Sequence, residues 1–337
     1  MTSNAVLLII LLMGFAPRTQ DAPTMPADPA AILSAAANVN GLTGSALLPW
    51  RLRVSYQIFD DKGHSKDSGV YEELWVSDKK YKRSYTSPSF TQTDFATDRG
   101  LYRSGNQNWP GPQEIMVRTE IVDPIPPALN LTGFRLESKR RSVDKVNLQC
   151  VTLKGDWIFL NNDAYCFQPD KPILRFTSAA GGKSDTLYND ILMFQGHFLA
   201  RNIRATNAGT RLVLHIDSIE QEPTVNDSDL TPPPDAIRIP AGKVAIPQQT
   251  MAVLLLRTLP PHYPESAKAA RITGTVLLQI TIGKDGRVTS AQAISGPNDL
   301  RKVSTEAALK WEYRPFLIAG EAAEVETTLP ITFTIGN

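Results

Sequence analysis

A series of short apolar–polar alternations extends from Trp50 to Ile219. β-Branched, aromatic and leucine residues recur at every second position in these runs, which is the spacing of side chains along one face of a β-strand. Turn-forming residues separate the runs at 61–63, 98–100, 181–182 and 207–209. Many short strands at even spacing predict a large antiparallel sheet, sandwich or barrel.

Two helices are predicted beside these strands. Residues 30–42 are rich in alanine and leucine and end at Asn40 and Gly41, as a helix with a left-handed terminator does. Residues 114–130 predict a helix that stops at Pro124 and is followed by a proline-rich corner. The sequence therefore indicates an α+β chain in which strands predominate.

A polar, proline-rich stretch from Gln221 to Pro247 marks a domain boundary. Beyond it the patterns predict the order α, β, β, α, β. The expected elements are a short helix from 264, strands at 275–282 and 287–295, a helix capped by Asn298 or Asp299, and a last strand at 325–335. Asp285 and Gly286 are expected to supply the positive-φ positions of a tight turn between the two strands.

The first apolar run, residues 5–16, is too short for the ~20 residues that a membrane-spanning helix needs. Its length matches the hydrophobic region of a secretory signal, although no Lys or Arg precedes it and Pro17 follows it. We expect an exported, periplasmic protein, which this segment could also hold at the membrane. A short buried N-terminal helix is the alternative.

Charge and motif content argue against several classes of function. The 35 Lys and Arg residues balance 34 Asp and Glu residues, so nucleic-acid binding by bulk electrostatics is disfavoured. The four histidines lie far apart and no catalytic or phosphate-binding motif is present, so we expect no enzyme, no metal site and no cofactor. The basic triplet 139–141 could bind an acidic head group, but such runs are more often solvated surface.

Cys150 and Cys166 are the two cysteines of the chain. Both lie in strand-like segments, and the loop between them would let them face each other across an antiparallel pair. Export would place them in an oxidising compartment, which favours a disulfide over the alternative of two buried thiols. Two cysteines also exclude a cysteine-based zinc site.

The last strand alternates, with one apolar set and one polar set: Val325, Leu329, Ile331, Phe333 and Ile335 against Glu326, Thr328, Thr332 and Thr334. Pro330 falls in the outward set. Because proline cannot donate to a strand ladder, the strand is expected at a sheet edge or at a bulge. Such an edge can accept an extended peptide. Alternatively, Pro330 and Glu326 only protect the edge against aggregation.

Several motifs follow one another in residues 259–335: Pro261-His262-Tyr263-Pro264, Gly274-Thr275-Val276, Asp285-Gly286-Arg287-Val288, Trp311-Glu312-Tyr313-Arg314-Pro315 and Leu329-Pro330-Ile331. The segment resembles the C-terminal domain of TonB energy transducers. The resemblance implies docking onto a short segment of an outer-membrane transporter by strand addition. The partner-binding residues would be Val325, Glu326, Thr328, Pro330, Thr332, Phe333 and Thr334.

The chain departs from complete transducers. Those proteins have an uncleaved membrane helix and then a long proline-rich rod, whereas here the apolar run is short and a β-rich domain precedes the module. The resemblance therefore supports docking and leaves force transduction in doubt.

A second set of residues, Gly69 to Trp75, Tyr81-Lys82-Arg83, Pro88, 98–102 and 229–239, resembles the LolA and LolB-like lipoprotein carriers over 30–240. That resemblance implies a curved half-barrel that holds acyl chains in an apolar cavity. Arg83 matches an arginine that secures the helical lid, and Trp75 and Tyr81 would accompany it at the cavity. The alternative places Arg83 on the surface of a plain β-domain.

Together these patterns predict four segments: a signal at 1–20, an N-terminal half-barrel at 21–240, a linker at 241–258 and a TonB-like domain at 259–337. The leading hypothesis is a periplasmic, non-enzymatic protein with a role in envelope transport. It would dock onto an outer-membrane transporter or other envelope protein, and its first domain would have room for a lipid, an apolar ligand or a lipoprotein acyl chain. The alternative is a scaffold with no bound ligand.

Overall fold

The computed structural model describes residues 23–44, 46–126, 131–132, 134–155, 163–179, 184–207 and 209–335. The predicted signal segment and the turn predicted at 181–182 lie outside these ranges. No helix within them has both the length and the apolar composition needed to cross a membrane.

Most of the described chain up to Arg238 forms one antiparallel sheet of 13 strands. The strands are β1 Trp50–Phe59, β2 Ser65–Ser77, β3 Lys80–Thr86, β4 Thr91–Thr97, β5 Gly100–Gly105, β6 Arg135–Val143, β7 Val146–Lys154, β8 Asp163–Phe167, β9 Leu174–Ala179, β10 Ser184–Phe194, β11 His197–Asn207, β12 Thr210–Gln221 and β13 Ile237–Arg238. Their order is β13-β5-β4-β3-β2-β1-β12-β11-β10-β9-β8-β7-β6. The predicted large antiparallel sheet is confirmed.

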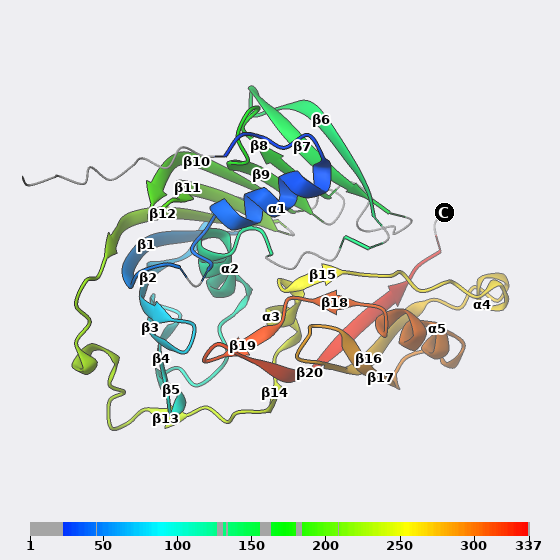
Figure 1. The fold of residues 1–337 in the computed structure, drawn as a ribbon. Helices are drawn as coiled ribbons and strands as arrows, with labels where there is room; N and C mark the ends of the chain where they lie inside the picture. The colour runs from blue at the N-terminus through cyan, green and yellow to red at the C-terminus, as the bar shows by residue number, and fades with distance from the viewer. Residues whose placement is uncertain are drawn as a thin grey trace, which may run out of the picture.

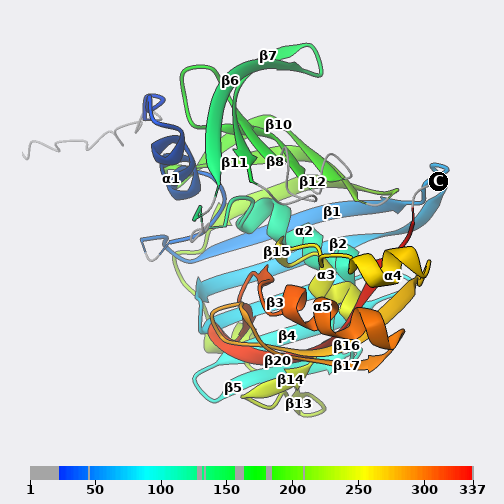
Figure 2. The same cartoon turned by 90° about the vertical axis from the view of Figure 1, so that its right-hand side faces the viewer.

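The sheet is apolar on one face because its strands alternate as predicted. In β1, Trp50, Leu52 and Val54 are fully buried, while Arg51 and Arg53 between them are exposed. Figures 1 and 2 show the sheet curving around the helices and the C-terminal elements on one side. The apolar side chains on the concave face thus form part of the core, and the polar side chains that alternate with them point to solvent from the opposite face.

Helices α1 (Pro29–Val39) and α2 (Pro112–Val122) pack against the sheet (Figure 1). The Asp28 carboxylate accepts a hydrogen bond from the Ala31 N–H at the start of α1. At its other end, Gly41 has a φ of +86°, which is the predicted left-handed terminator. Helix α2 ends before Pro124, also as predicted.

Residues 243–335, here called the C-terminal module, form a second sheet of five strands in the described chain. Its elements are β14 Lys243–Ala245, α3 Gln248–Ala252, β15 Leu255–Arg257, α4 Glu265–Ala269, β16 Gly274–Ile282, β17 Val288–Ser295, α5 Asn298–Ala308, β18 Glu312–Tyr313, β19 Phe316–Ile318 and β20 Glu321–Phe333. The sheet order is β14-β20-β16-β17, with β19 also paired to β20, while β15 pairs with β18. The predicted α, β, β, α, β elements correspond to α4, β16, β17, α5 and β20.

Three details of the module differ from the sequence prediction. Pro297, not Asn298 or Asp299, occupies the N-cap of α5, and no side chain caps that helix. Gly286 adopts a positive φ of +82° in the β16–β17 turn, but Asp285 does not. Ile335 is 41% exposed because β20 ends at Phe333, so the apolar alternation continues past the last pairing with β16.

The module lies against the concave side of the large sheet and over α2 (Figures 1 and 2). Buried apolar residues of the large sheet, of both helices and of the module form one connected cluster. At the contact, Trp109 meets Phe316 edge-on at 5.0 Å between ring centroids. Thr250 in α3 donates a hydrogen bond to the Pro110 carbonyl at 2.9 Å. The two parts therefore share a core.

The polar stretch from Gln221 to Pro247, predicted as a domain boundary, is itself structured. It includes a 3₁₀ turn at Asp227–Leu230, and its β13 pairs with β5 of the large sheet while β14 pairs in parallel with β20 of the module. One short connection thus contributes a strand to each sheet.

The predicted disulfide between Cys150 and Cys166 is confirmed. The two residues are direct neighbours across antiparallel β7 and β8, and they pack with Leu148 and Ala164 in a small buried cluster. This cluster is separate from the shared core, so the bond ties together the strands near one end of the large sheet.

We expect that replacing both cysteines, Cys150→Ser with Cys166→Ser, lowers the free energy of unfolding by about 3 kcal/mol, because the bond closes a loop of about sixteen residues in the unfolded chain. Urea titration of both proteins measures the change. Thiol titration of the denatured, unreduced protein should find no free thiol. Two free thiols, or equal stability of the two proteins, would contradict the prediction.

Candidate functional site

Strand β20 carries most of the predicted partner-binding residues. Val325 and Phe333 are buried and face the core, whereas Thr328 and Thr332 are exposed and Pro330 is half-buried. Thr334 is exposed just after the strand ends. The predicted alternation of β20 is therefore present, and the predicted set is divided between the two faces of the strand.

The outer edge of β20 can be identified from its backbone. The Ile246 N–H donates to the Glu326 carbonyl on the edge away from β16. Because backbone groups of alternate residues point to the same edge of a strand, Thr328, Pro330 and Thr332 direct theirs to this edge as well. Pro330 therefore sits where no N–H is needed for pairing with β16, as the edge prediction requires.

Strand β14 occupies the beginning of this outer edge. It pairs in parallel with Glu324, Val325 and Glu326, and Lys243 forms ion pairs with both glutamates. Ile246 is buried at 3% exposure at the end of the pairing. In the described part of the chain no strand pairs with this edge beyond Glu326. The edge from Thr328 to Phe333 is thus open.

The residues predicted for a ligand cavity and lid lie elsewhere, on the concave face of the large sheet. Trp75 stacks on Trp50 with ring centroids 5.7 Å apart. Tyr81 is 5% exposed, and the Arg83 guanidinium lies 4.3 Å from the centre of its ring. The side chain of Arg83 is 18% exposed, so the alternative of a surface position for it is wrong.

Arg83 reaches helix α2 through a buried carboxylate. Glu73 in β2 has a fully buried side chain and accepts hydrogen bonds from Arg83 at 2.9 Å, from Arg118 of α2 at 3.1 Å, and from the Tyr71 hydroxyl. Burial alone would raise the pKa of Glu73, but Arg118, Arg83 and the Tyr71 hydrogen bond outweigh burial and lower it to about 2. This ionic cluster fixes α2 on the sheet.

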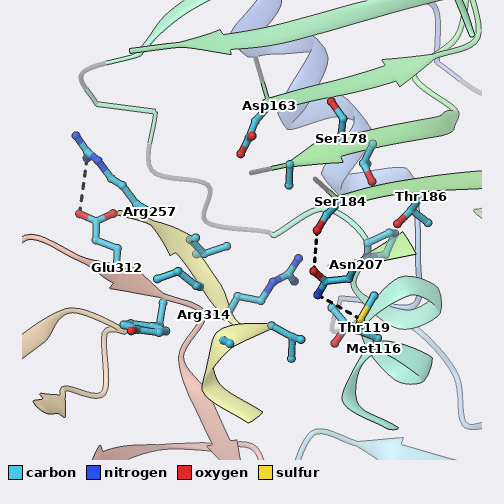
Figure 3. Close-up of a pocket in the computed structure, with 18 of the residues that line it drawn as sticks. Met116, Thr119, Asp163, Ser178, Ser184, Thr186, Asn207, Arg257, Glu312 and Arg314 are labelled. Carbon is cyan, nitrogen blue, oxygen red and sulfur yellow. Dashed lines mark hydrogen bonds and ion pairs between the residues drawn. The ribbon is translucent and has the colours of Figure 1, made fainter. Parts of the chain in front are cut away.

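A cavity of about 750 Å³ opens between the large sheet, α2 and the module. Figure 3 shows its lining residues converging from all three parts. The lining includes Met116, Thr119, Glu120, Phe134, Leu153, Asp163, Tyr165, Tyr188, Asn207, Val253, Leu255, Thr258 and Arg314. Such a volume is within the range of small-molecule sites, and a position between domains is typical of them.

Titratable groups that line this cavity, and Asp123 beside its Arg314, have shifted pKa values. Burial raises the pKa of Glu120, and the hydrogen bond donated by the Tyr188 hydroxyl and the nearby Arg314 oppose that rise. Burial likewise raises the pKa of Asp123, against the effect of Arg314. Burial raises the pKa of Tyr165 to about 12. Shifts of this kind, caused by burial plus a specific partner in a cleft, are associated with functional sites.

Trp75, Tyr81 and Arg83 do not line this cavity, so the structure does not bring the predicted lid residues and the cavity together. The cavity could not be predicted from the sequence, because the large sheet and the module, which form two of its walls, are far apart in the chain. Arg314 belongs to the motif at 311–315, but no sequence pattern indicates that it contacts Asp123, 191 residues earlier.

No group of three or more His, Cys, Asp or Glu side chains suited to a metal ion occurs among the described residues. His215 lies opposite Asn202 in the β11–β12 pairing, five positions from His197, and its ring contacts the Asn202 side chain. The two histidines are therefore out of register.

Comparison with protein families matches residues 260–335 to the C-terminal part of the Gram-negative bacterial TonB protein. Two curated relatives, both called Protein TonB, come from strains B100 and ATCC 33913 of Xanthomonas campestris pv. campestris. Each is 31% identical over 78 residues, which are 23% of this chain and 35% of the relative. The chain thus spans about a third of the length of these relatives.

Among solved structures, the chain is similar to a LolA superfamily protein from Nitrosomonas europaea, with 13% identity, 61% of this chain and 99% of that chain covered, and a TM-score of 0.38. It is also similar to a DUF1329 family protein from Desulfovibrio piger, with 8% identity, 60% and 98% coverage, and a TM-score of 0.37. Scores this low carry no argument about function.

Replacing Glu73 with Gln should destabilise the chain by about 3–5 kcal/mol, because it leaves the Arg83 and Arg118 charges buried beside a neutral group. The neighbouring exposed Glu72, paired with Arg53, provides the control, and Glu72→Gln should change stability by less than about 1 kcal/mol. Urea unfolding at pH 7 measures both changes.

The stability difference between the unmodified chain and Glu73→Gln should also depend on pH. The folded-state pKa of Glu73 is lowered, so its contribution is complete above the ordinary value of 4.5 and is lost as pH falls towards about 2. The stability difference between the unmodified chain and Glu73→Gln should therefore shrink between pH 4.5 and 2. A difference that stays constant over that range would contradict the assigned ion pairs.

Proposed function

We propose that this chain is a non-enzymatic protein of the bacterial envelope, exported to the periplasm, whose C-terminal module docks onto an outer-membrane transporter or another envelope protein by strand addition at the open edge of β20. The observation that carries the proposal is that edge itself, from Thr328 to Phe333. It has no strand partner in the described chain, and it lies within the segment that matches TonB C-terminal domains.

The geometry of the edge supports an extended peptide as the occupant. Outward backbone groups of Thr328 and Thr332 are available for a ladder, while Val325 and Phe333 hold the strand on the core from its other side. Pro330 offers a carbonyl but no N–H, so a partner strand would make an interrupted ladder there. A short partner segment therefore suits this edge better than a long one.

A second part of the proposal is that the large sheet and its helices contribute a ligand site with a role in envelope transport. The observation that favours it is the cavity of about 750 Å³ between sheet, α2 and module. A lipid, an apolar ligand or a lipoprotein acyl chain is the class of ligand expected there. The alternative function is a scaffold, in which the edge of β20 binds no partner strand and the cavity binds no ligand.

Docking is tested by titrating the full chain with extended peptides from outer-membrane transporters of the same organism and following backbone amide NMR shifts. We expect the shifts to cluster at residues 327–334. Thr332→Pro should weaken binding at least about tenfold, because it removes an outward N–H and adds a ring at the edge. Thr332→Ala keeps the backbone donor and serves as the matched control, with affinity nearly unchanged.

Shifts that cluster away from β20, or peptides that fail to bind at millimolar concentration, would contradict docking and favour the scaffold. Thermal unfolding of Thr332→Pro shows whether the variant loses binding because the edge is changed or because the chain has unfolded. The N–H of Thr332 points away from β16, so the variant is expected to stay folded.

Strand β14 should limit the length of the docked segment, because it already pairs with Glu324 to Glu326. Replacing Lys243–Ala245 with Gly-Ser-Gly removes the buried Val244 side chain and the Lys243 ion pairs. The peptide-induced shifts should then extend to residues 324–326, and affinity should rise. Lys243→Gln, which removes the charge alone, is the control and should not change the footprint. An unchanged footprint in the triple replacement would show that β14 does not compete.

A further inference from the structure

Arg314 projects from the module into the cavity with part of its hydrogen-bonding capacity unused. Its Nη1 donates to the Asp123 carbonyl at 2.9 Å and to the Asp123 carboxylate at 2.6 Å. Within the described residues its Nε and Nη2 have no hydrogen-bond partner. Figure 3 shows the side chain extending from the module in the direction of Asn207. A guanidinium in this arrangement can still bind a carboxylate or phosphate in a bidentate manner.

Neutral polar groups at the same cavity could complete a site for an oxygen-rich head group. Thr258 is 8% exposed, and its hydroxyl has no hydrogen-bond partner in the part of the chain that the structure describes. Asn207 and Thr119 also line the cavity, from β11 and α2. A buried hydroxyl left without a partner is costly, and a bound ligand oxygen would satisfy it.

Most of the acidic groups nearby are engaged, whereas Asp185 of β10 also lines the cavity and has no ion-pair partner among the described residues. Asp123 is the partner of Arg314, and Glu120 accepts from the Tyr188 hydroxyl. Asp163, from β8, also has an interaction partner. Burial raises the pKa of Glu120 and of Asp123, and Arg314 opposes the rise in both. Arg257 and Arg287, at the module wall, are paired with Glu312.

The remaining lining suits an aliphatic chain. Met116, Phe134, Leu153, Val253 and Leu255 bring apolar surface to the cavity from α2, the large sheet and the module. Sites with mostly apolar walls and a few convergent polar groups bind small amphiphilic molecules, with the polar groups fixing the orientation.

We propose that this cavity binds a single-chain amphiphile with an anionic head group, a carboxylate or a phosphate, which the module's Arg314 receives while the chain lies between the large sheet and the module. This rests on the ligand role proposed above and adds that the site needs both parts of the chain. Ligand binding would thereby favour the module's position against the sheet, because the ligand contacts both sides.

The test measures the binding of four probes to the full chain by titration calorimetry, below their critical micelle concentrations. The probes share a twelve-carbon chain and differ in the head group: dodecanoate, dodecyl phosphate, dodecanol and dodecylammonium. We expect dodecanoate or dodecyl phosphate to bind at least about tenfold more tightly than dodecanol, with dodecylammonium the weakest. The ratio between the two anions identifies whether the head group is a carboxylate or a phosphate.

Two variants separate the head-group role of Arg314 from its role in the ion pair. Arg314→Gln should weaken the binding of the preferred anion about tenfold or more and leave dodecanol unchanged. Asp123→Asn breaks the same ion pair but keeps the guanidinium, so the preferred anion should bind as well as before or better. Arg99→Gln, an exposed arginine in the β4–β5 turn, controls for net charge.

Equal losses in Arg314→Gln and Asp123→Asn would assign Arg314 a structural role only and would overturn the inference. Equal affinities for the four probes in the unmodified chain would overturn it as well, while leaving the ligand role in place. If none of the probes binds, both the inference and the proposed ligand role fail. Peptide docking at β20 is measured separately and is unaffected by these outcomes. Because the comparison of probes needs no variant, the test stands even if Arg314→Gln does not fold.

Discussion

Burial of the concave face of the large sheet is the constraint on which the rest of the structure depends. A curved antiparallel sheet of this size presents more apolar surface than two eleven-residue helices can cover. The module supplies the missing cover, and its buried residues join those of the sheet in one cluster. The cover is incomplete beside α2, and the cavity with Arg314 lies there. Packing thus explains why the module and the cavity occur together.

Much of the fold could be predicted from the sequence because it depends on local patterns. The alternation in β1 and β20, the termination of α1 at Gly41 and the order of the module's elements all follow from spacing and backbone preference. Elements of two or three residues, such as β13 and β14, could not be predicted. Such short strands are determined by the neighbour to which they bond, and not by a period of their own.

The candidate sites also differ in how far the sequence predicts them, because one depends on a local pattern and the other on contacts between distant residues. The open edge of β20 follows from Pro330, since a proline in a strand restricts that strand wherever it lies. The cavity depends on the contact between Arg314 and Asp123, which are 191 residues apart, and no local pattern encodes such a pair. Arg83 is intermediate: the resemblance to lipoprotein carriers singles it out, but only the register of β2 and β3 shows that Glu73 is its partner.

The connection between β13 and β14 links the two sites mechanically. Arg238 pairs with the large sheet and Lys243 pairs with the module, so five chain steps, at most about 17 Å, separate the two attachments. The module therefore cannot move far from the large sheet while both pairings last. Since β14 occupies the outer edge of β20, a partner strand that displaced it would also release this tether. Docking at the edge and the position of the module beside the cavity would then depend on the same short segment of chain.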